Sequence, residues 1–242
     1  MRALRLTLLA GTVLMAASPA LGQDIAINLG DDTALATRSL QLIALITLLS
    51  LVPGIAVMVT CFPFIVTVLS ILRQAIGLQQ APPNMLIISL ALFLTWYVMD
   101  PVLTQAWTKG LAPLADGRLT LDAALPEVVG PFRAFMSARL DPDTFQSLAS
   151  LRAETAGAAV ETAPLSLLVP SFLLSEIQRA FEIGFVLFLP FLIIDLVVAA
   201  VLMSMGMMMV PPAIVSLPFK LAFFVVADGW SLLASALVRS YL

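Results

Sequence analysis

The sequence contains no histidine and only one cysteine, Cys61, among its 242 residues. Without histidine the chain has no His-based catalytic triad, proton shuttle or metal ligand. A single cysteine excludes an internal disulfide and a zinc site built from cysteines. A glycine-rich phosphate-binding loop is also absent from the sequence. We therefore expect no enzymatic activity, no metal and no other cofactor.

Charge is equally scarce. Charged residues make up 11% of the chain, hydrophobic residues 61%, and the net charge is −3, whereas soluble domains are roughly 25% charged and about 45–50% apolar. So little charge cannot cover a water-facing surface, which excludes an ordinary cytosolic enzyme and a disordered chain. The missing basic excess excludes a nucleic-acid binder. The composition indicates a membrane protein.

The few charges divide the chain into blocks. Residues 1–39 hold six, residues 40–99 hold one, residues 100–182 hold sixteen and residues 183–242 hold four. Two apolar blocks therefore flank a polar middle. We predict an all-α membrane protein with two kinked helical hairpins, about four apolar helices in all, and a polar, partly helical middle region.

The N-terminus has the marks of a secretory signal peptide. Arg2 and Arg5 precede an apolar run at 6–17, and small residues follow up to Gln23. We predict a cleavable signal peptide at 1–22 and an exterior segment at 23–39. An uncleaved signal-anchor helix is the alternative, although the run is short for a membrane span.

The first hairpin is predicted over 40–103. Its first apolar stretch, 40–72, is interrupted at Pro53-Gly54 and at Pro63, where the helix should kink or break because proline lacks a backbone donor. A polar turn follows at 73–83. The second span should run from Asn84 to about residue 102, closed by Asp100 and the proline after it.

The second hairpin is predicted over 175–242. The polar middle before it, at 104–174, should contain short helices at 126–139 and 144–152 and no independent core. Ser175 is a plausible helix N-cap. Bends are expected at Pro190 and Pro218, on either side of a turn at 206–212. With an exterior N-terminus and four spans, both hairpin turns face the cytoplasm, an orientation supported only by Arg73.

Two opposite charges lie inside the second hairpin. Asp195 and Lys220 are equally far along the sequence from the middle of its turn, so at ~1.5 Å per residue they lie at equal depth on antiparallel helices. One interpretation is a structural ion pair that fixes hairpin register, and the other is a gate or ion site. An intramembrane aspartyl protease needs two converging aspartates. Asp195 and Asp100 are the only candidates, and Asp100 lies at a span end, so the sequence does not favour a protease.

Methionines gather in the turn of this hairpin. Five of the eleven fall in one window, Met203, Met205, Met207, Met208 and Met209. Methionine is flexible and apolar. Several copies around one axis would form a compliant apolar constriction, whereas a single copy could use these side chains for lipid or partner packing. Spacing alone leaves both interpretations open.

Nine short stretches together resemble the FliP family, membrane components of the flagellar type III export apparatus. They lie at 50–54, 60–64, 71–75, 80–84, 181–185, 189–198, 203–212, 216–220 and 228–230. The resemblance covers about 40–103 and 165–238 and is weakest in the polar middle. An injectisome export-gate homologue is a related alternative.

The resemblance implies a non-enzymatic pore subunit that assembles as a ring or helical homo-oligomer, expected to be a pentamer. The partners it implies are FliQ and FliR in the gate, FlhB and FlhA of the export apparatus, the flagellar basal-body ring, membrane lipid and the unfolded proteins in transit. The location it implies is the bacterial inner membrane, as a multi-pass protein of the basal body. In the family, the assembled subunits rise largely above the bilayer plane.

The resemblance also assigns roles to residues. It implies that Met207 to Met209 lie at the pore constriction, and that Asp195, Lys220 and Glu176 form ion pairs supporting the hairpins. Arg139 is our choice of partner for Glu176. A proton-coupled transporter that uses Asp195, and an assembly scaffold without a pore, remain the alternatives from other classes.

Overall fold

The computed structural model describes residues 32–77 and 82–241, with side chains from residue 38 onward. The predicted signal peptide at 1–22, and the exterior segment up to residue 31, lie outside the described residues. Across the described ranges the chain is helical and contains no strand. This confirms the predicted all-α class.

Contacts divide the chain into two units, residues 1–49 and 50–242. Helix α2 (Asp32–Met58) begins in the first unit and ends in the second. In the first unit, every large apolar side chain from Leu40 to Leu49 is exposed. Because α2 begins at Asp32, the last residues of the predicted exterior segment, 32–39, form the start of this helix.

In the first predicted hairpin, the helix is broken just before Pro63. Helix α2 continues through Pro53 and Gly54 to Met58, so a bend there stays a prediction. The chain then leaves the helix at residues 59–61, and α3 (Phe62–Ile76) begins with Pro63 in its first turn. Proline is favoured there because the first N–H groups of a helix have no intrahelical partner.

Helix α4 (Asn84–Ala106) packs against α3 and begins where the sequence predicts. Its predicted end at about residue 102, closed by Asp100 and Pro101, is wrong. Pro101 lies inside the helix, which continues through a π-helical turn, η1 (Trp107–Leu111), into α5 (Ala112–Ala115). Packing supports the extension. A Cβ added to Gly110 in η1 would lie 2.4 Å from Val128 Cγ2 on α6, so η1 and α6 are in close contact.

The polar middle contains α6 (Leu121–Arg139) and α7 (Pro142–Ala149), close to the two short helices predicted there. Two small apolar clusters fill the space between these helices and the start of α8. One contains Phe145, Ala149, Ala163 and Leu167, and the other contains Met136, Leu168 and Phe172.

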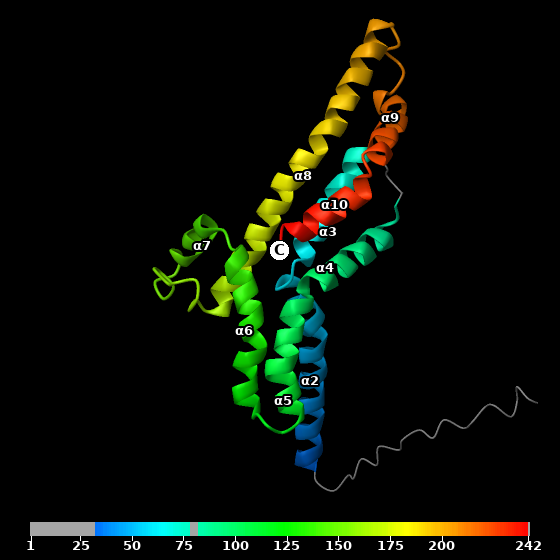
Figure 1. Ribbon diagram of the computed structural model, residues 1–242. Coiled ribbons are helices and arrows are strands. Elements are labelled where there is room, and N and C mark those ends of the chain that lie inside the picture. The colour runs from blue at the N-terminus through cyan, green and yellow to red at the C-terminus, as the bar shows by residue number, and fades with distance from the viewer. Residues whose placement is uncertain (1–31, 78–81, 242) are drawn as a thin grey trace, which may run out of the picture. The chain divides into compact units, whose positions relative to one another are not determined.

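Helix α8 (Leu165–Ser204) is the long yellow helix of Figure 1 and passes through both Pro170 and Pro190. The prediction of Ser175 as its N-cap is wrong. The helix starts at Leu165, and Ser175 is buried with its hydroxyl donating to the carbonyl of Ser171 at 2.8 Å. A serine can satisfy its hydroxyl on the preceding helical turn, so its presence alone does not mark a helix start.

The chain returns beside α8 as α9 (Pro212–Val226), drawn in orange, followed by α10 (Gly229–Arg239), drawn in red. The axis turns by 61° between α9 and α10. The break lies at residues 227–228, whereas Pro218 is inside α9. Asp228 has a φ of 49°, in the left-handed region, which an aspartate tolerates better than most residues.

The main core of residues 50–242 lies where α3 meets α4, α8, α9 and α10. Helices α3 and α8 are in close contact at Gly184, where an added Cβ would lie 2.4 Å from Ile71 Cδ1. Much apolar surface remains outside this core. In the described ranges, α2, α4 with its extension and α8 are long and apolar enough to cross a membrane, and α9 with α10 adds a bent fourth candidate. The fold fits a membrane protein.

Candidate functional site

The methionine-rich turn between α8 and α9 is built by local backbone chemistry. Gly206, with a φ of 75°, ends α8 in the left-handed conformation. Its N–H donates to the carbonyl of Met203 and the N–H of Met207 donates to that of Leu202, both at 3.0 Å. This is the Schellman pattern that satisfies the last carbonyls of a helix. Pro211 and Pro212 then start α9 with the φ that proline imposes.

The turn directs its methionines away from the chain's own core. Met203 and Met205 are 61% and 58% exposed, and Met207 is 40% exposed. Met208 and Met209 are 84% and 97% exposed. Side chains as exposed as those of Met208 and Met209 contribute little to the packing of the chain. They are available for contacts outside it.

An ion pair connects the two helices behind this turn. Lys220 Nζ on α9 lies 2.6 Å from Asp195 Oδ2 on α8. The lysine side chain is 7% exposed and the aspartate side chain 33% exposed. The structure thus brings together the two charges that the sequence places at equal depth.

Two further groups complete this site, and the sequence analysis missed both. Ser216 is buried and donates to Asp195 Oδ1 at 2.5 Å. Lys220 Nζ also donates to the carbonyl oxygen of Ala75 at 3.0 Å, in the last turn of α3. The Ser216 contact could have been predicted from the sequence, because Ser216 precedes Lys220 by one helical turn on the same face. The second depends on how α3 packs, which no local pattern reveals.

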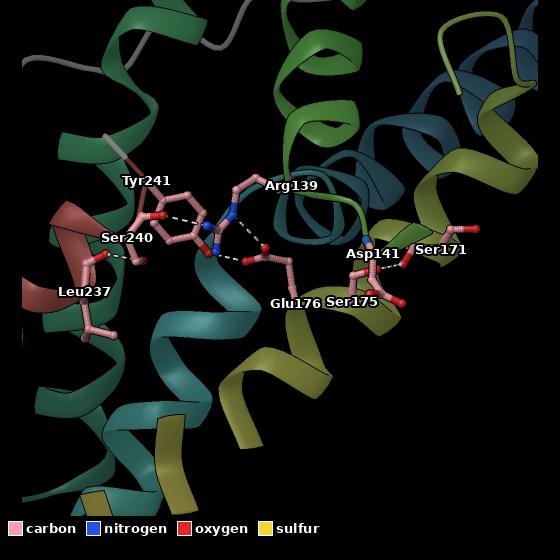
Figure 2. A network of polar contacts seen from close by, with 8 residues as sticks. All are labelled: Arg139, Asp141, Ser171, Ser175, Glu176, Leu237, Ser240 and Tyr241. Carbon is pink, nitrogen blue, oxygen red and sulfur yellow. Dashed lines mark hydrogen bonds and ion pairs between the residues drawn. The ribbon is translucent and has the colours of Figure 1, made fainter. Parts of the chain in front are cut away.

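A second buried charge pair lies near the junction of α6 and α7 (Figure 2). Glu176 of α8 has no exposed surface, and its Oε1 accepts a hydrogen bond from Arg139 Nε at 3.1 Å. Arg139 is the last residue of α6. The backbone N–H of Asp141 donates to Ser175 Oγ at 3.0 Å, which ties the same junction to α8 again.

Ser240 and Tyr241, which follow α10, contact this pair. Arg139 Nη1 donates to the carbonyl oxygen of Ser240 at 2.6 Å, and the Tyr241 hydroxyl donates to Glu176 Oε2. The guanidinium of Arg139 lies 4.0 Å from the centre of the Tyr241 ring, within the range of a cation–π contact. Burial, and then the Glu176 carboxylate, raises the pKa of Tyr241 well above its usual range. The phenol therefore remains protonated and keeps its role as a donor.

These groups connect helices: one pair joins α8 to α9, and the other joins α6 to α8. Both pairs combine a buried charge with its counter-ion and added hydrogen bonds, which a charge needs inside a protein. Within 38–77 and 82–241 no three histidine, cysteine, aspartate or glutamate side chains gather as metal ligands. The arrangement positions an exposed apolar turn at the end of a braced helical hairpin.

Comparison with known proteins gives a consistent result. The model of the FliP family matches residues 45–237 of this chain. The flagellar biosynthetic protein FliP of Caulobacter vibrioides is 51% identical over 215 residues, which cover 89% of this chain and 81% of that protein. The proteins of the same name from Agrobacterium fabrum and Bacillus subtilis are 46% and 42% identical, over 87% and 85% of this chain and 86% and 93% of their own lengths.

The family model spans both apolar blocks and the polar middle between them. It includes the methionine-rich turn and all four residues of the two charge pairs. This chain belongs to the FliP family.

Proposed function

We propose that this protein is a core pore subunit of the flagellar type III protein export gate in the bacterial inner membrane. Copies of it, five in our proposal, assemble with FliQ and FliR around a channel for unfolded flagellar proteins, next to FlhB and FlhA and within the basal-body ring. The methionine-rich turn, residues 203–209, forms the constriction of that channel. Family membership supports the export role, and the constriction rests on the turn itself.

The observation that carries the constriction is the exposure of Met208 and Met209, at 84% and 97%. Both lie at the tip of the hairpin of α8 and α9, as far from the core of one copy as this hairpin reaches. A ring of such tips would bring flexible thioether side chains to one axis. Methionine adapts to irregular shapes, and a narrow apolar ring excludes water and ions. The same ring yields to a passing polypeptide.

The ion pair behind the turn supports this proposal mechanically. A constriction seals only if each copy presents its tip at the same height. Sliding α9 along α8 by one turn, about 5.4 Å, would separate Lys220 from Asp195 and leave a buried ammonium without its counter-ion. The pair therefore fixes the position of the turn relative to α3 and the rest of the core.

The test replaces Met207, Met208 and Met209 together by alanine. Smaller side chains should leave the ring open, so we expect the inner membrane to leak small ions and the amount of secreted flagellar protein to change. Met85→Ala is the matched control, because Met85 is 75% exposed on α4, outside the turn. Unchanged ion permeability and unchanged secretion in the triple variant, at normal protein levels, would rule out the constriction. An absence of conductance from the purified oligomer would favour a scaffold without a pore.

A further inference from the structure

A cleft of about 490 Å³ lies between α4 with η1 and α6, away from the methionine-rich turn and from both charge pairs. Its size falls within the ~300–1,000 Å³ typical of ligand pockets. Its walls are mostly apolar, and the side chains that matter here are Trp96, Asp100, Thr104, Trp107, Val128 and Phe132. The proposed gate function uses none of them.

One face of a single helix supplies the polar and aromatic part of the cleft. Trp96, Asp100 and Thr104 follow at intervals of four residues, and Trp107 follows three residues later. Residues at this spacing are neighbours on a helix surface. Trp96 is thus the helical neighbour of Asp100 on one side, and Trp107 lies about two turns beyond the carboxylate on the other side, next to Thr104. The two indoles are 66% and 58% exposed. Trp107 begins the π-helical turn η1, a distortion that is frequent at functional sites.

Asp100 has no partner for its charge in the described part of the chain. Three ion pairs occur there, and none includes Asp100. Its side chain is exposed beside an apolar wall that includes Val128 and Phe132 of α6. A carboxylate binds cations by charge-assisted hydrogen bonds, and indole faces attract cations as well. The cleft is complementary to one positive charge that carries apolar groups beside it.

We propose that this cleft binds an arginine or lysine side chain, flanked by apolar residues, of a partner polypeptide. The cation pairs with Asp100 between the two indoles, and the flanking residues cover the apolar wall. Tryptophan and arginine are the residue types that most often dominate binding at protein interfaces. A phospholipid headgroup fits less well, because no basic residue lines the cleft and its phosphate would lie next to Asp100.

The test is a direct titration of the full-length chain in detergent. The probe is an acetylated and amidated pentapeptide with arginine between two leucines on each side. Its comparison peptide carries citrulline, which has the shape of arginine without the charge. Tryptophan fluorescence reports binding, and Trp230→Phe removes the only indole that lies outside the cleft. We expect the arginine peptide to bind about tenfold more tightly than the citrulline peptide. Charge-assisted hydrogen bonds are roughly twice as strong as neutral ones, and about 1.4 kcal/mol corresponds to a tenfold difference in Kd.

Variants make the assignment specific. Asp100→Asn should abolish the difference between the two peptides, while Asp100→Glu should retain most of it. Asp122→Asn on α6 is the matched control, because it removes the same charge from an exposed site outside the cleft. Equal affinity for both peptides, or a preference for arginine that survives Asp100→Asn, would overturn the proposal. So would displacement of the arginine peptide by lysophosphatidylethanolamine in the wild type but not in Asp100→Asn, which would assign the cleft to a lipid headgroup.

Discussion

Lys220 joins three helices through one ammonium group. Its Nζ lies 2.6 Å from Asp195 Oδ2 on α8 and donates at 3.0 Å to the carbonyl oxygen of Ala75 on α3. That carbonyl belongs to the last turn of α3, where carbonyls lack intrahelical partners and a cation is favourable. The lysine thus neutralises Asp195 and caps α3 at the same time. The second hairpin is thereby fixed to the first.

We predict that Asp195→Asn destabilises the protein by about 1–3 kcal/mol. This is less than the ~3–5 kcal/mol for breaking a fully buried pair, because the aspartate side chain is one-third exposed and solvent screens part of its interaction. The buried Lys220 would lose its counter-ion. Adding Lys220→Met should recover part of the loss, and chemical unfolding in detergent measures both.

The same variants separate the gate from a proton-coupled transporter. If the pair is structural, Asp195→Asn reduces the amount of assembled complex, and the double variant restores part of it. Normal assembly with complete loss of transport in Asp195→Asn would instead favour the transporter.

We predict that Gly184→Ala destabilises the core by about 1–3 kcal/mol, the usual range for an overpacked site. Its Cβ would lie 2.4 Å from Ile71 Cδ1 and 3.1 Å from Ile71 Cγ2, so either the Ile71 side chain must leave its position or α8 and α3 must move apart. Ile71→Val removes Cδ1 and should partly rescue the variant.

Gly54→Ala is the control for the helix-forming effect of alanine. Nothing lies within 4 Å of a Cβ added to Gly54, so this change should be neutral or stabilise by up to ~1 kcal/mol. Thermal unfolding in detergent of Gly184→Ala, of Gly184→Ala with Ile71→Val, and of Gly54→Ala checks the prediction. Equal effects at Gly184 and Gly54 would show that the close helix contact does not constrain the core.

We predict that Tyr241 makes stability fall as pH rises above about 10, the ordinary pKa of its phenol. The folded protein holds this proton more tightly than the unfolded chain does, since burial raises the folded pKa. Above that pH the unfolded state has lost the proton and the folded state retains it, so unfolding is favoured. Below it the contribution is fully present.

Tyr241→Phe should remove this component of the alkaline pH dependence and lower stability near neutral pH by about 1–3 kcal/mol, because Glu176 loses a hydrogen-bond donor in a buried site. The measurement is the free energy of unfolding between pH 7 and 11 for both proteins. Identical curves would contradict the prediction.

We predict that Gly206→Ala costs about 1–2 kcal/mol, the usual price of a left-handed conformation for a residue with a Cβ. The φ of Gly206 is 75°, and relief of this strain would change the path of the methionine-rich turn. Membrane ion permeability should therefore change as well.

Gly157→Ala is matched to this variant, because Gly157 has a φ of 76° in a turn of the polar middle. It should lose similar stability and leave permeability unchanged. A permeability change of equal size in both variants would mean that general destabilisation, and not the shape of the turn, is responsible.

Much of the fold could be predicted because membrane-type helices depend on local composition. Long runs with hardly any charge predict apolar helices, and the polar residues before Asn84 predicted that α4 starts there. Helix ends were less predictable. Ser175 and Pro101 both lie inside helices, since packing against α3 and α6 outweighs the local preference for a cap or a break. The 61° turn between α9 and α10 lies beside Asp228, which no local pattern marked, and a bend at Pro218 stays a prediction.

The sequence by itself determined the membrane class, the two apolar blocks, the family and the gathering of methionines in the turn, because each depends on residue type and on order along the chain. It also brought Asp195 and Lys220 to equal depth, since antiparallel helices about a short turn have a fixed rise per residue. Only the tertiary structure decided that Lys220 also caps α3, that Tyr241 closes over Glu176, and that Asp100 faces a cleft beside α6. These contacts join residues far apart in the chain, and they exist only because close helix packing, at glycines such as Gly184, brings those surfaces together.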